Sequence, residues 1–286
     1  MNYRHAFHAG GFADVIKHIV LVRILMHLRE KEAPFRVIDS HAGAGVYDLH
    51  GDEATRTGEW TTGIARAMQA RFTEATVPLV EPYLEIVRSF NKPRELKVYP
   101  GSPMIARRMM RPQDRMVACE VEPTARKHLI SALRRDKQAR IVDLDGWVGL
   151  PAFVPPNERR GMVLIDPPFE KKDEFERMAM AFDEAFAKWS TGIFVLWYPV
   201  KSRRATDALA QHVARTADAA ATPAKCLRLE FSVAPQSPEG GLTSAGLLIV
   251  NPPFKLLGEL KTILPELEKP LGQGGASRFR LETARP

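Results

Sequence analysis

The sequence predicts an α/β fold, with a Rossmann-like, mostly parallel sheet covered by helices and an antiparallel pair of strands at its end. Short apolar runs such as residues 162–165 and 193–198 are typical of strands that are buried on both faces of a parallel sheet. Between such runs lie longer segments with apolar residues at helical spacing, as in successive βαβ units. With 286 residues, 45% of them hydrophobic, the chain is expected to form one domain, residues 1–286.

The elements are expected in a regular order. Apolar residues recur with a helical period over residues 14–30, so this segment is expected to be a helix with Asp14 as its cap. Residues 35–39 form the first strand. After residue 99, helices are expected at 104–110, 124–133, 173–188 and 205–219, and strands at 116–120, 140–146, 161–166, 192–199, 227–233 and 246–250.

The regular order is interrupted after the first strand. A Rossmann unit reaches the acidic end of its second strand about 20 residues after its glycine turn. Here the best candidate, residues 116–120, comes much later, and two segments with helical spacing, 57–72 and 80–90, lie before it. We therefore infer a small helical insertion over residues 47–98, next to the mouth of the glycine turn.

Composition limits the class of protein. A formal charge of +7 and an isoelectric point near 9.5 favour a polyanionic partner, although many proteins are mildly basic without binding nucleic acid. Cys119 and Cys226 lie far apart, which gives no disulfide framework and no zinc spacing. The longest apolar run, residues 193–200, is too short to span a bilayer, and the chain starts without an apolar signal region. We expect a cytoplasmic protein with no metal and no membrane contact.

The most informative motif is Asp166-Pro167-Pro168-Phe169, directly after the buried run 162–165. It lies at the carboxyl end of a central strand, where open α/β sheets bind ligands. The Asp166 carboxylate and the Pro167 carbonyl are two acceptors for the N–H groups of a nucleobase amine, and Phe169 offers a face on which the base can stack. The motif therefore favours amino methylation of a base. The other interpretation is a proline-rich turn with Asp166 as a helix cap.

A second motif follows the first strand, where Asp39 precedes Gly43 and Gly45. Glycines allow a tight turn and close approach to a ligand. The loop resembles the cofactor loop of Rossmann-type S-adenosylmethionine methyltransferases, although His41 stands where a further glycine is common. A nicotinamide cofactor is disfavoured because the third glycine of a dinucleotide fingerprint is absent.

Two further acidic positions fit the same cofactor. Glu120 ends a strand and is placed to accept hydrogen bonds from ribose hydroxyls; the alternative is a surface glutamate. Asp145 and Gly146 form a turn that could hold the adenine amine, and Asp-Gly is also a common turn with no function.

Residues 251–254, Asn-Pro-Pro-Phe, form a second tetrad of the same type. The two tetrads end different strands, so they cannot serve one catalytic centre. The strand that ends at Asp166 is expected at the centre of the sheet and the last strand at its periphery. We therefore expect Asp166 to be catalytic and Asn251 to form a structural turn.

The segment 3–11 is dense in aromatic, basic and glycine residues, a mixture that suits a loop touching RNA or a ligand. An ordinary solvated N-terminus is the alternative. His5 and His8 have a possible metal spacing, but no carboxylate or cysteine stands near them in the sequence. We therefore expect no metal site.

Taken together, these motifs resemble the ribosomal RNA large subunit methyltransferase J family, with similarity over nearly the whole chain and the blocks in the family's order. The blocks are residues 3–10, 13–18, 39–45, 99–103, 165–169, 196–199 and 250–254. The resemblance implies a Rossmann-like S-adenosylmethionine-dependent methyltransferase fold. It also implies N6 methylation of a specific adenine in 23S rRNA, with S-adenosyl-L-methionine as the cofactor.

The resemblance also assigns roles to residues. It implies that the cofactor-binding positions are His18, His41, Ser102, Glu120, Asp145, Gly146 and Asp166. Gly43 belongs to the same loop, and Lys17 is expected close to the same pocket. Asp166 also matches the catalytic residue, and Tyr3 a position that contacts the substrate RNA. Phe169 departs from the family's usual tyrosine, which removes a hydroxyl but keeps the stacking face.

Two rival functions use the same features. A DNA adenine-N6 or cytosine-N4 methyltransferase would share the tetrad, but the sequence shows no separate target-recognition domain. A non-catalytic nucleic-acid-binding protein on the same fold would have no need of Asp166, Gly43 or Glu120. We expect a monomer whose partner is 23S rRNA.

Overall fold

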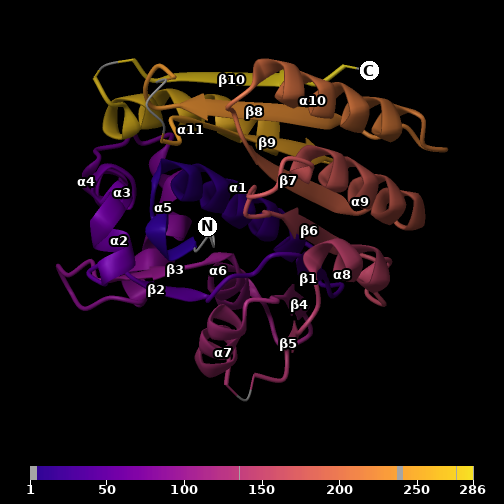
Figure 1. The fold of residues 1–286 in the computed structure, drawn as a ribbon, viewed down its shortest axis with the longest axis horizontal. Coiled ribbons are helices and arrows are strands. Elements are labelled where there is room, and N and C mark those ends of the chain that lie inside the picture. Colours follow the sequence, from indigo (N-terminus) through magenta and orange to yellow (C-terminus); the bar gives the residue numbers. More distant parts are fainter. Residues whose placement is uncertain (1–4, 135, 237–240, 275, 286) are drawn as a thin grey trace.

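The computed structural model of the protein describes residues 5–134, 136–236, 241–274 and 276–285. Its centre is an eight-stranded sheet with the order β10-β8-β9-β7-β6-β1-β4-β5 (Figure 1). The strands are β1 (Arg36–Asp39), β4 (Arg115–Cys119), β5 (Ala139–Val142), β6 (Gly161–Ile165), β7 (Ile193–Pro199), β8 (Cys226–Ser232), β9 (Ser244–Val250) and β10 (Arg278–Thr283).

The direction of the strands confirms the predicted mixed sheet. β1 lies between β4 and β6 and is parallel to both, and β5 and β7 extend this parallel part on either side. β9 runs antiparallel to both β7 and β8, and β10 adds a further antiparallel strand beside β8. The sequence pattern did not predict β10, an edge strand whose residues are all exposed or only partly buried.

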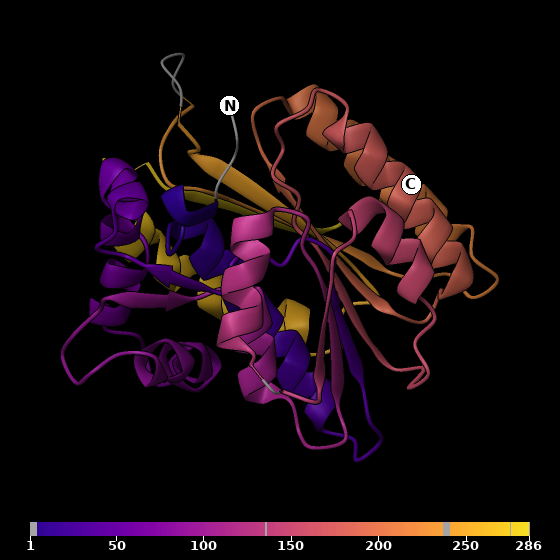
Figure 2. The same cartoon turned by 60° about the horizontal axis from the view of Figure 1, so that its bottom comes forward.

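Helices cover both faces of the sheet (Figures 1 and 2). On one face, α1 (Phe12–Arg29), α6 (Ser102–Met109), α7 (Pro123–Ala132) and α11 (Leu256–Leu271) contribute to one apolar cluster. On the other face, α8 (Gly146–Phe153), α9 (Glu174–Lys188) and α10 (Arg203–Asp218) surround a second cluster. The sequence pattern missed α8, whose segment includes Gly146, Gly149 and an internal proline, all poor helix formers.

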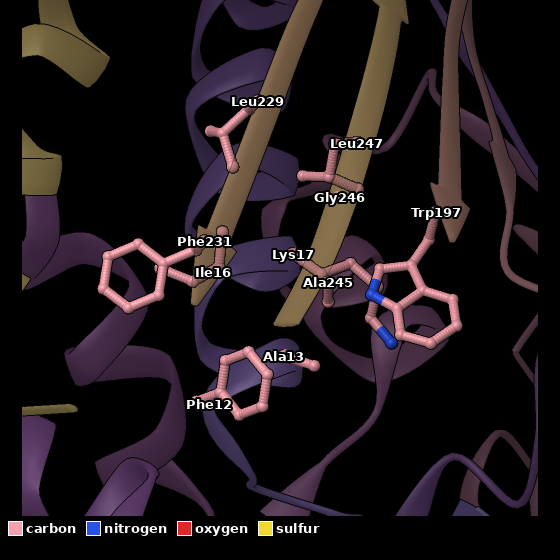
Figure 3. Close-up of a pocket in the computed structure, with 10 residues that line it drawn as sticks. All are labelled: Phe12, Ala13, Ile16, Lys17, Trp197, Leu229, Phe231, Ala245, Gly246 and Leu247. Atoms are coloured by element: carbon pink, nitrogen blue, oxygen red, sulfur yellow. The ribbon is translucent and has the colours of Figure 1, made fainter. Parts of the chain in front are cut away.

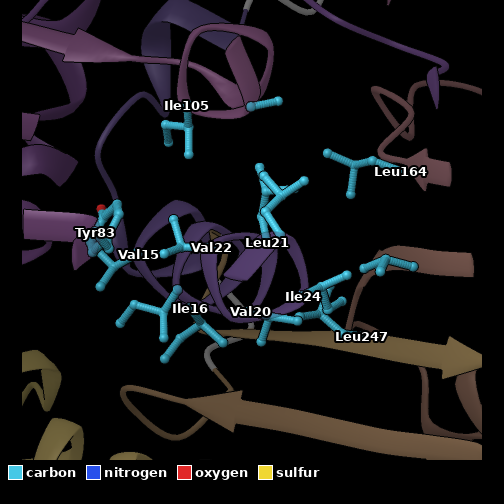
Figure 4. Packing of buried hydrophobic residues seen from close by; sticks show 14 of the residues in the cluster. Val15, Ile16, Val20, Leu21, Val22, Ile24, Tyr83, Ile105, Leu164 and Leu247 are labelled. Carbon is cyan, nitrogen blue, oxygen red and sulfur yellow. The ribbon is translucent and has the colours of Figure 1, made fainter. Parts of the chain in front are cut away.

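Helix α1 is largely buried because it is apolar on nearly every side. It packs against α6, against α11 and against the sheet (Figure 4). The surrounding side chains shown there include Tyr83, Ile105, Leu164 and Leu247. Two polar residues of α1 face the site, Lys17 and His18. Because both are buried, the close packing around them restricts their side chains.

The chain between β1 and β4 carries a small antiparallel pair, β2 (Val46–Asp48) and β3 (Val98–Pro100). Between these strands lie α2 (Asp52–Thr57), α3 (Glu59–Thr62), α4 (Ile64–Gln69) and α5 (Val77–Ser89). The single helix expected over residues 57–72 was wrong, because Gly58 (φ 62°) and Gly63 end successive short helices there.

The N-terminal segment packs onto these helices. The short 3-10 helix η1 (His5–Phe7) contacts α2, and the Ile64 amide donates a hydrogen bond to the Gly10 carbonyl at 2.8 Å. Within the described ranges, no helix combines the length and apolar character needed to cross a bilayer.

Candidate functional site

A cavity of about 930 Å³ opens at the carboxyl ends of β1, β4 and β6, bordered by α1, β2 and α7. This volume is within the usual range for pockets that hold a small molecule. The cavity brings together most of the predicted cofactor residues, namely Lys17, His18, His41, Gly43, Ser102, Glu120 and Asp166. Other lining residues that the sequence pattern did not single out are Tyr47, Asp48, Asp52, Glu53, Thr124 and His128.

Asp166 stands at the end of β6 and contacts a lysine from α1. Its Oδ2 lies 2.5 Å from Lys17 Nζ, and the same ammonium lies 2.7 Å from Asp14 Oδ1. Burial acts to lower the pKa of Lys17, but the two carboxylates more than offset it and raise that pKa above its ordinary value. The ammonium therefore stays charged and bridges the two acids.

Asp14 is not the N-cap of α1, because the helix begins at Phe12. Instead, its carboxylate contacts several neighbouring groups. Its Oδ2 accepts hydrogen bonds from the Gly10 amide and pairs with His5 Nε2, both at 3.0 Å. Burial raises the pKa of Asp14, yet the charges of His5 and Lys17 hold it well below 3.8. The expectation that no carboxylate lies near the two N-terminal histidines was wrong, since His8 also contacts Glu59 at 2.8 Å. The described ranges contain no group of three or more side chains arranged to hold a metal ion.

The glycine loop is held against the end of β4. The Gly43 amide donates to Glu120 Oε2 at 2.7 Å, and the Glu122 amide donates to the other oxygen, also at 2.7 Å. Burial raises the pKa of Glu120. Gly43 has φ 65°, and a Cβ there would lie 2.2 Å from the Tyr47 hydroxyl, so no other residue fits without rearrangement.

Asp39 lies beneath the loop at the end of β1. It accepts a hydrogen bond from Ser102 Oγ at 2.7 Å, while its Oδ1 has no hydrogen-bond partner among the described residues. Burial raises the pKa of Asp39 to about 6. This carboxyl group therefore combines a fixed orientation with an unused acceptor.

Two of the histidines that line the cavity, His41 and His18, are neutral near pH 7. Burial lowers the pKa of His41 to about 4, and its Nδ1 lies 2.8 Å from Ser40 Oγ. Burial also lowers the pKa of His18 well below its ordinary value. His18 Nδ1 lies 2.7 Å from the Tyr99 hydroxyl, whereas Nε2 has no partner within the described part of the chain.

Four predicted residues lie outside the wall of the cavity: Asp145, Gly146, Pro167 and Phe169. Asp145 caps α8 by accepting from the Trp147 amide at 2.9 Å. Gly146 lies so close to the glycine loop that a Cβ would be 2.0 Å from the Ser40 carbonyl and 2.7 Å from the His41 ring. The start of α8 therefore packs directly against His41.

Phe169 turns away from the cavity, with φ 50° and its ring against Phe175 and Trp197 at centroid distances of 5.0 and 5.8 Å. Pro167 is buried, and Pro168 lines the cavity in its place. Tyr3 lies outside the described residues. A narrow apolar slot on the other side of Lys17 is lined by Trp197, Phe231 and Leu247, and the lysine side chain passes beside Trp197 (Figure 3).

Asn251-Pro-Pro-Phe254 lies at the opposite edge of the sheet from Asp166. The expectation that its strand is peripheral was wrong, because β9 lies between β7 and β8. Its antiparallel direction, not its position, places its end away from the cavity. Asn251 has φ 54°, and its Nδ2 donates to the carbonyls of Ser190 and Gly192 at 2.7 and 2.8 Å. These contacts support a structural turn.

The fold and the site define a class of protein. A parallel core with β1 at its centre, a glycine loop after β1, an acid after β4 and an Asp-Pro-Pro tetrad after β6 form a Rossmann-like methyltransferase fold of the kind that uses S-adenosylmethionine.

Comparisons with known proteins specify the family. Residues 32–282 match the family described as "Ribosomal RNA large subunit methyltransferase D, RlmJ". The chain is 39% identical to ribosomal RNA large subunit methyltransferase J of Escherichia coli K12, over 97% of each chain. It is 36% identical to the protein of that name from Haemophilus influenzae, over 100% of this chain and 99% of the relative.

A solved structure shares the fold throughout. The crystal structure of protein LPL1258 from Legionella pneumophila superposes with a TM-score of 0.87 at 34% identity, covering 97% of this chain and 98% of the other. The chain belongs to the ribosomal RNA large subunit methyltransferase J family.

Proposed function

We propose that this protein transfers a methyl group from S-adenosyl-L-methionine to the N6 amine of a specific adenine in 23S rRNA. The observation that carries the proposal is the position of Asp166, at the end of β6 and on the wall of the cavity that contains the predicted cofactor residues. The family membership supports an rRNA substrate, because both relatives are named large subunit rRNA methyltransferases.

The residues present fit the cofactor. Glu120, at the end of β4, would accept hydrogen bonds from the ribose hydroxyls, as strand-end acids do in this type of fold. His18 lines the cavity, and its Nε2 has no partner in the described ranges, so it is available to a polar ligand. Gly43, Ser102 and His41 complete the wall. Asp145 and Gly146 would hold the adenine amine once the start of α8 adjusts. When bound, the cofactor supplies an electrophilic methyl group.

Asp166 would orient the acceptor amine. Lys17 occupies its Oδ2, and no hydrogen bond within the described ranges uses its Oδ1. Oδ1 is therefore the acceptor for one N–H of the adenine amine, and the Pro167 carbonyl is the candidate for the other. The amine loses a proton as it is alkylated, and Asp166 would accept it. Most of the rate enhancement would come from holding donor and acceptor at reacting distance.

The remaining substrate contacts follow from the position of the site. Phe169 is proposed to stack on the extruded base after its ring leaves Trp197, and Tyr3 is proposed to contact the RNA. The net charge of +7 supplies salt-dependent affinity for phosphates. We propose that residues 47–98 form an insertion within a single domain and that the protein is a monomer. We also propose a cytoplasmic location, which fits a ribosomal RNA substrate.

The test is methyl transfer with labelled cofactor. The protein is incubated with S-adenosylmethionine and 23S rRNA, either protein-free or in ribosomal particles, and methylated nucleotides are mapped. A single N6-methyladenine in 23S rRNA is expected, and it should be absent with Asp166→Ala. Preferential methylation of duplex DNA would favour the DNA methyltransferase alternative. Cofactor binding without transfer to any nucleic acid would contradict the proposal.

A further inference from the structure

A chain of three buried aromatic side chains runs from the segment between β2 and β3 to the cavity. The Tyr83 hydroxyl, on α5, lies 2.9 Å from the Tyr99 hydroxyl, on β3. The Tyr99 hydroxyl in turn lies 2.7 Å from His18 Nδ1, on α1. All three side chains are fully buried, and the rings of His18 and Tyr99 are stacked at 5.6 Å. Three separate elements are thus joined by two hydrogen bonds.

These groups share three hydrogens. Burial raises the pKa values of Tyr83 and Tyr99, so each hydroxyl keeps its hydrogen. Burial lowers the pKa of His18; Asp14 opposes this shift and Lys17 and His5 add to it, so the imidazole is neutral and carries one hydrogen. That hydrogen is on either Nδ1 or Nε2, depending on the direction of the two hydrogen bonds.

Hydrogen-bond satisfaction selects one direction. If His18 Nδ1 donated to Tyr99, Tyr99 would have to donate to Tyr83. The Tyr83 hydrogen would then have no acceptor, since Tyr99 is its sole hydrogen-bond partner in the described part of the chain. A buried donor without a partner is costly. In the reverse direction, Tyr83 donates to Tyr99 and Tyr99 donates to Nδ1, so that both hydroxyl hydrogens are used and Nε2–H is the one group of the three left without a partner among the described residues. The first direction would leave two groups unpaired there, the Tyr83 hydrogen and the Nε2 lone pair.

We propose that Tyr83 and Tyr99 are positioning residues that hold His18 in its Nε2–H tautomer, so that this N–H binds the carboxylate of S-adenosylmethionine. The proposal rests on the proposed function. His18 lines the cavity, its Nδ1 is used by Tyr99, and Nε2 is buried without a partner among the described residues. A buried N–H on a residue that lines the cavity needs an acceptor, and the carboxylate is the anionic group of this cofactor.

The hydrogen bonds from Tyr83 to Tyr99 and from Tyr99 to His18 also give the segment 47–98 a role in cofactor binding. Tyr83 belongs to α5, which packs on α1, and it does not line the cavity itself, although its ring lies 6.5 Å from that of His18. Its hydroxyl is linked to His18 through the Tyr99 hydroxyl. The effect of removing the Tyr83 hydroxyl should therefore be smaller than that of removing the Tyr99 hydroxyl, because the Tyr99 donor still reaches Nδ1.

Binding of two ligands by calorimetry tests the proposal. S-Adenosylhomocysteine has the carboxylate, whereas 5′-methylthioadenosine lacks the whole amino-acid end. Tyr99→Phe should weaken the binding of S-adenosylhomocysteine about five- to tenfold, which corresponds to the loss of one ordinary hydrogen bond. The affinity for methylthioadenosine should be unchanged. Tyr83→Phe should show a smaller loss with the same selectivity. Tyr198→Phe, which removes a buried hydroxyl bonded to Glu230 on the other face of the sheet, should change neither affinity.

The tautomer is measured directly in the ligand-free wild-type protein, by long-range ¹H–¹⁵N spectra of the His18 ring, so the proposal stays testable even if Tyr99→Phe folds poorly. Hydrogen on Nε2 is expected. Hydrogen on Nδ1 would overturn the proposal. Equal weakening of the binding of both ligands by Tyr99→Phe would also overturn it. Failure of the wild-type protein to bind either ligand would instead contradict the proposed function.

Discussion

Lys17 Nζ lies 2.5 Å from Asp166 Oδ2, although 149 residues separate the two in the sequence. The lysine belongs to α1, a largely buried helix, and Asp14, on the same helix, contacts the other side of its ammonium at 2.7 Å. The candidate catalytic carboxylate is thus oriented by a charge that cannot move without breaking a second buried contact.

Asp166→Ala should abolish methyl transfer without unfolding the protein, because it removes the acceptor for the adenine amine. Asn251→Ala is the matched control from the second tetrad, and it should remain active because Asn251 lies at the opposite edge of the sheet. Both are measured by transfer of labelled methyl groups to 23S rRNA, with circular dichroism as a check of folding. Equal loss of rate in two folded variants would refute the assignment of Asp166.

Asp14→Asn should destabilise the fold at neutral pH by about 1.5 to 3 kcal/mol, the value of a hydrogen bond to a charged group. The native pKa of Asp14 lies well below its unfolded value of 3.8, despite burial, because of His5 and Lys17. The stabilisation is therefore fully present above about pH 4 and is lost as the pH falls through the native pKa. Denaturant titrations of both proteins at neutral and acidic pH measure the difference, and a gap that grew in acid would be evidence against this role.

Asp39→Asn should have the opposite pH dependence. Burial raises the native pKa of Asp39 to about 6, above its unfolded value of 3.8. As the pH rises through 6, ionisation of Asp39 therefore lowers the free energy of unfolding of the wild-type protein by up to about 3 kcal/mol. The asparagine variant, which keeps an acceptor for Ser102, should be the more stable protein at pH 8, and this advantage should shrink toward pH 4. Thermal unfolding across that range provides the measurement; an unchanged difference would mean that Asp39 titrates normally.

Glu120→Ala and Asp145→Ala should each weaken S-adenosylmethionine binding by about 1 to 3 kcal/mol, the cost of losing a hydrogen bond to a charged group. Asp145 also caps α8 and Glu120 accepts from the Gly43 amide, so unfolding is measured in parallel. Calorimetry of the folded variants gives the affinities. Wild-type affinity in both would remove these residues from the cofactor site.

Local sequence patterns were sufficient for the fold class and for the principal site motifs. Buried apolar runs predicted the parallel strands, and the residues directly after them, Glu120 and Asp166, follow those strands at the edge where the cavity opens. This works because the carboxyl ends of parallel strands share one edge of the sheet. The mixed sheet was predicted from alternation in residues 227–233, and the glycine turn from Gly43 and Gly45, which both have positive φ.

The tertiary structure alone decided which distant side chains meet. Nothing in the local pattern brings Lys17 to Asp166, His5 to Asp14 or Tyr83 to Tyr99, since each contact depends on how α1 and the segment between β2 and β3 pack on the sheet. The same is true of Asn251, whose distance from the site follows from the direction of β9 within the sheet. Periodicity records which face of an element is buried, whereas contacts between elements depend on the packing of the whole chain.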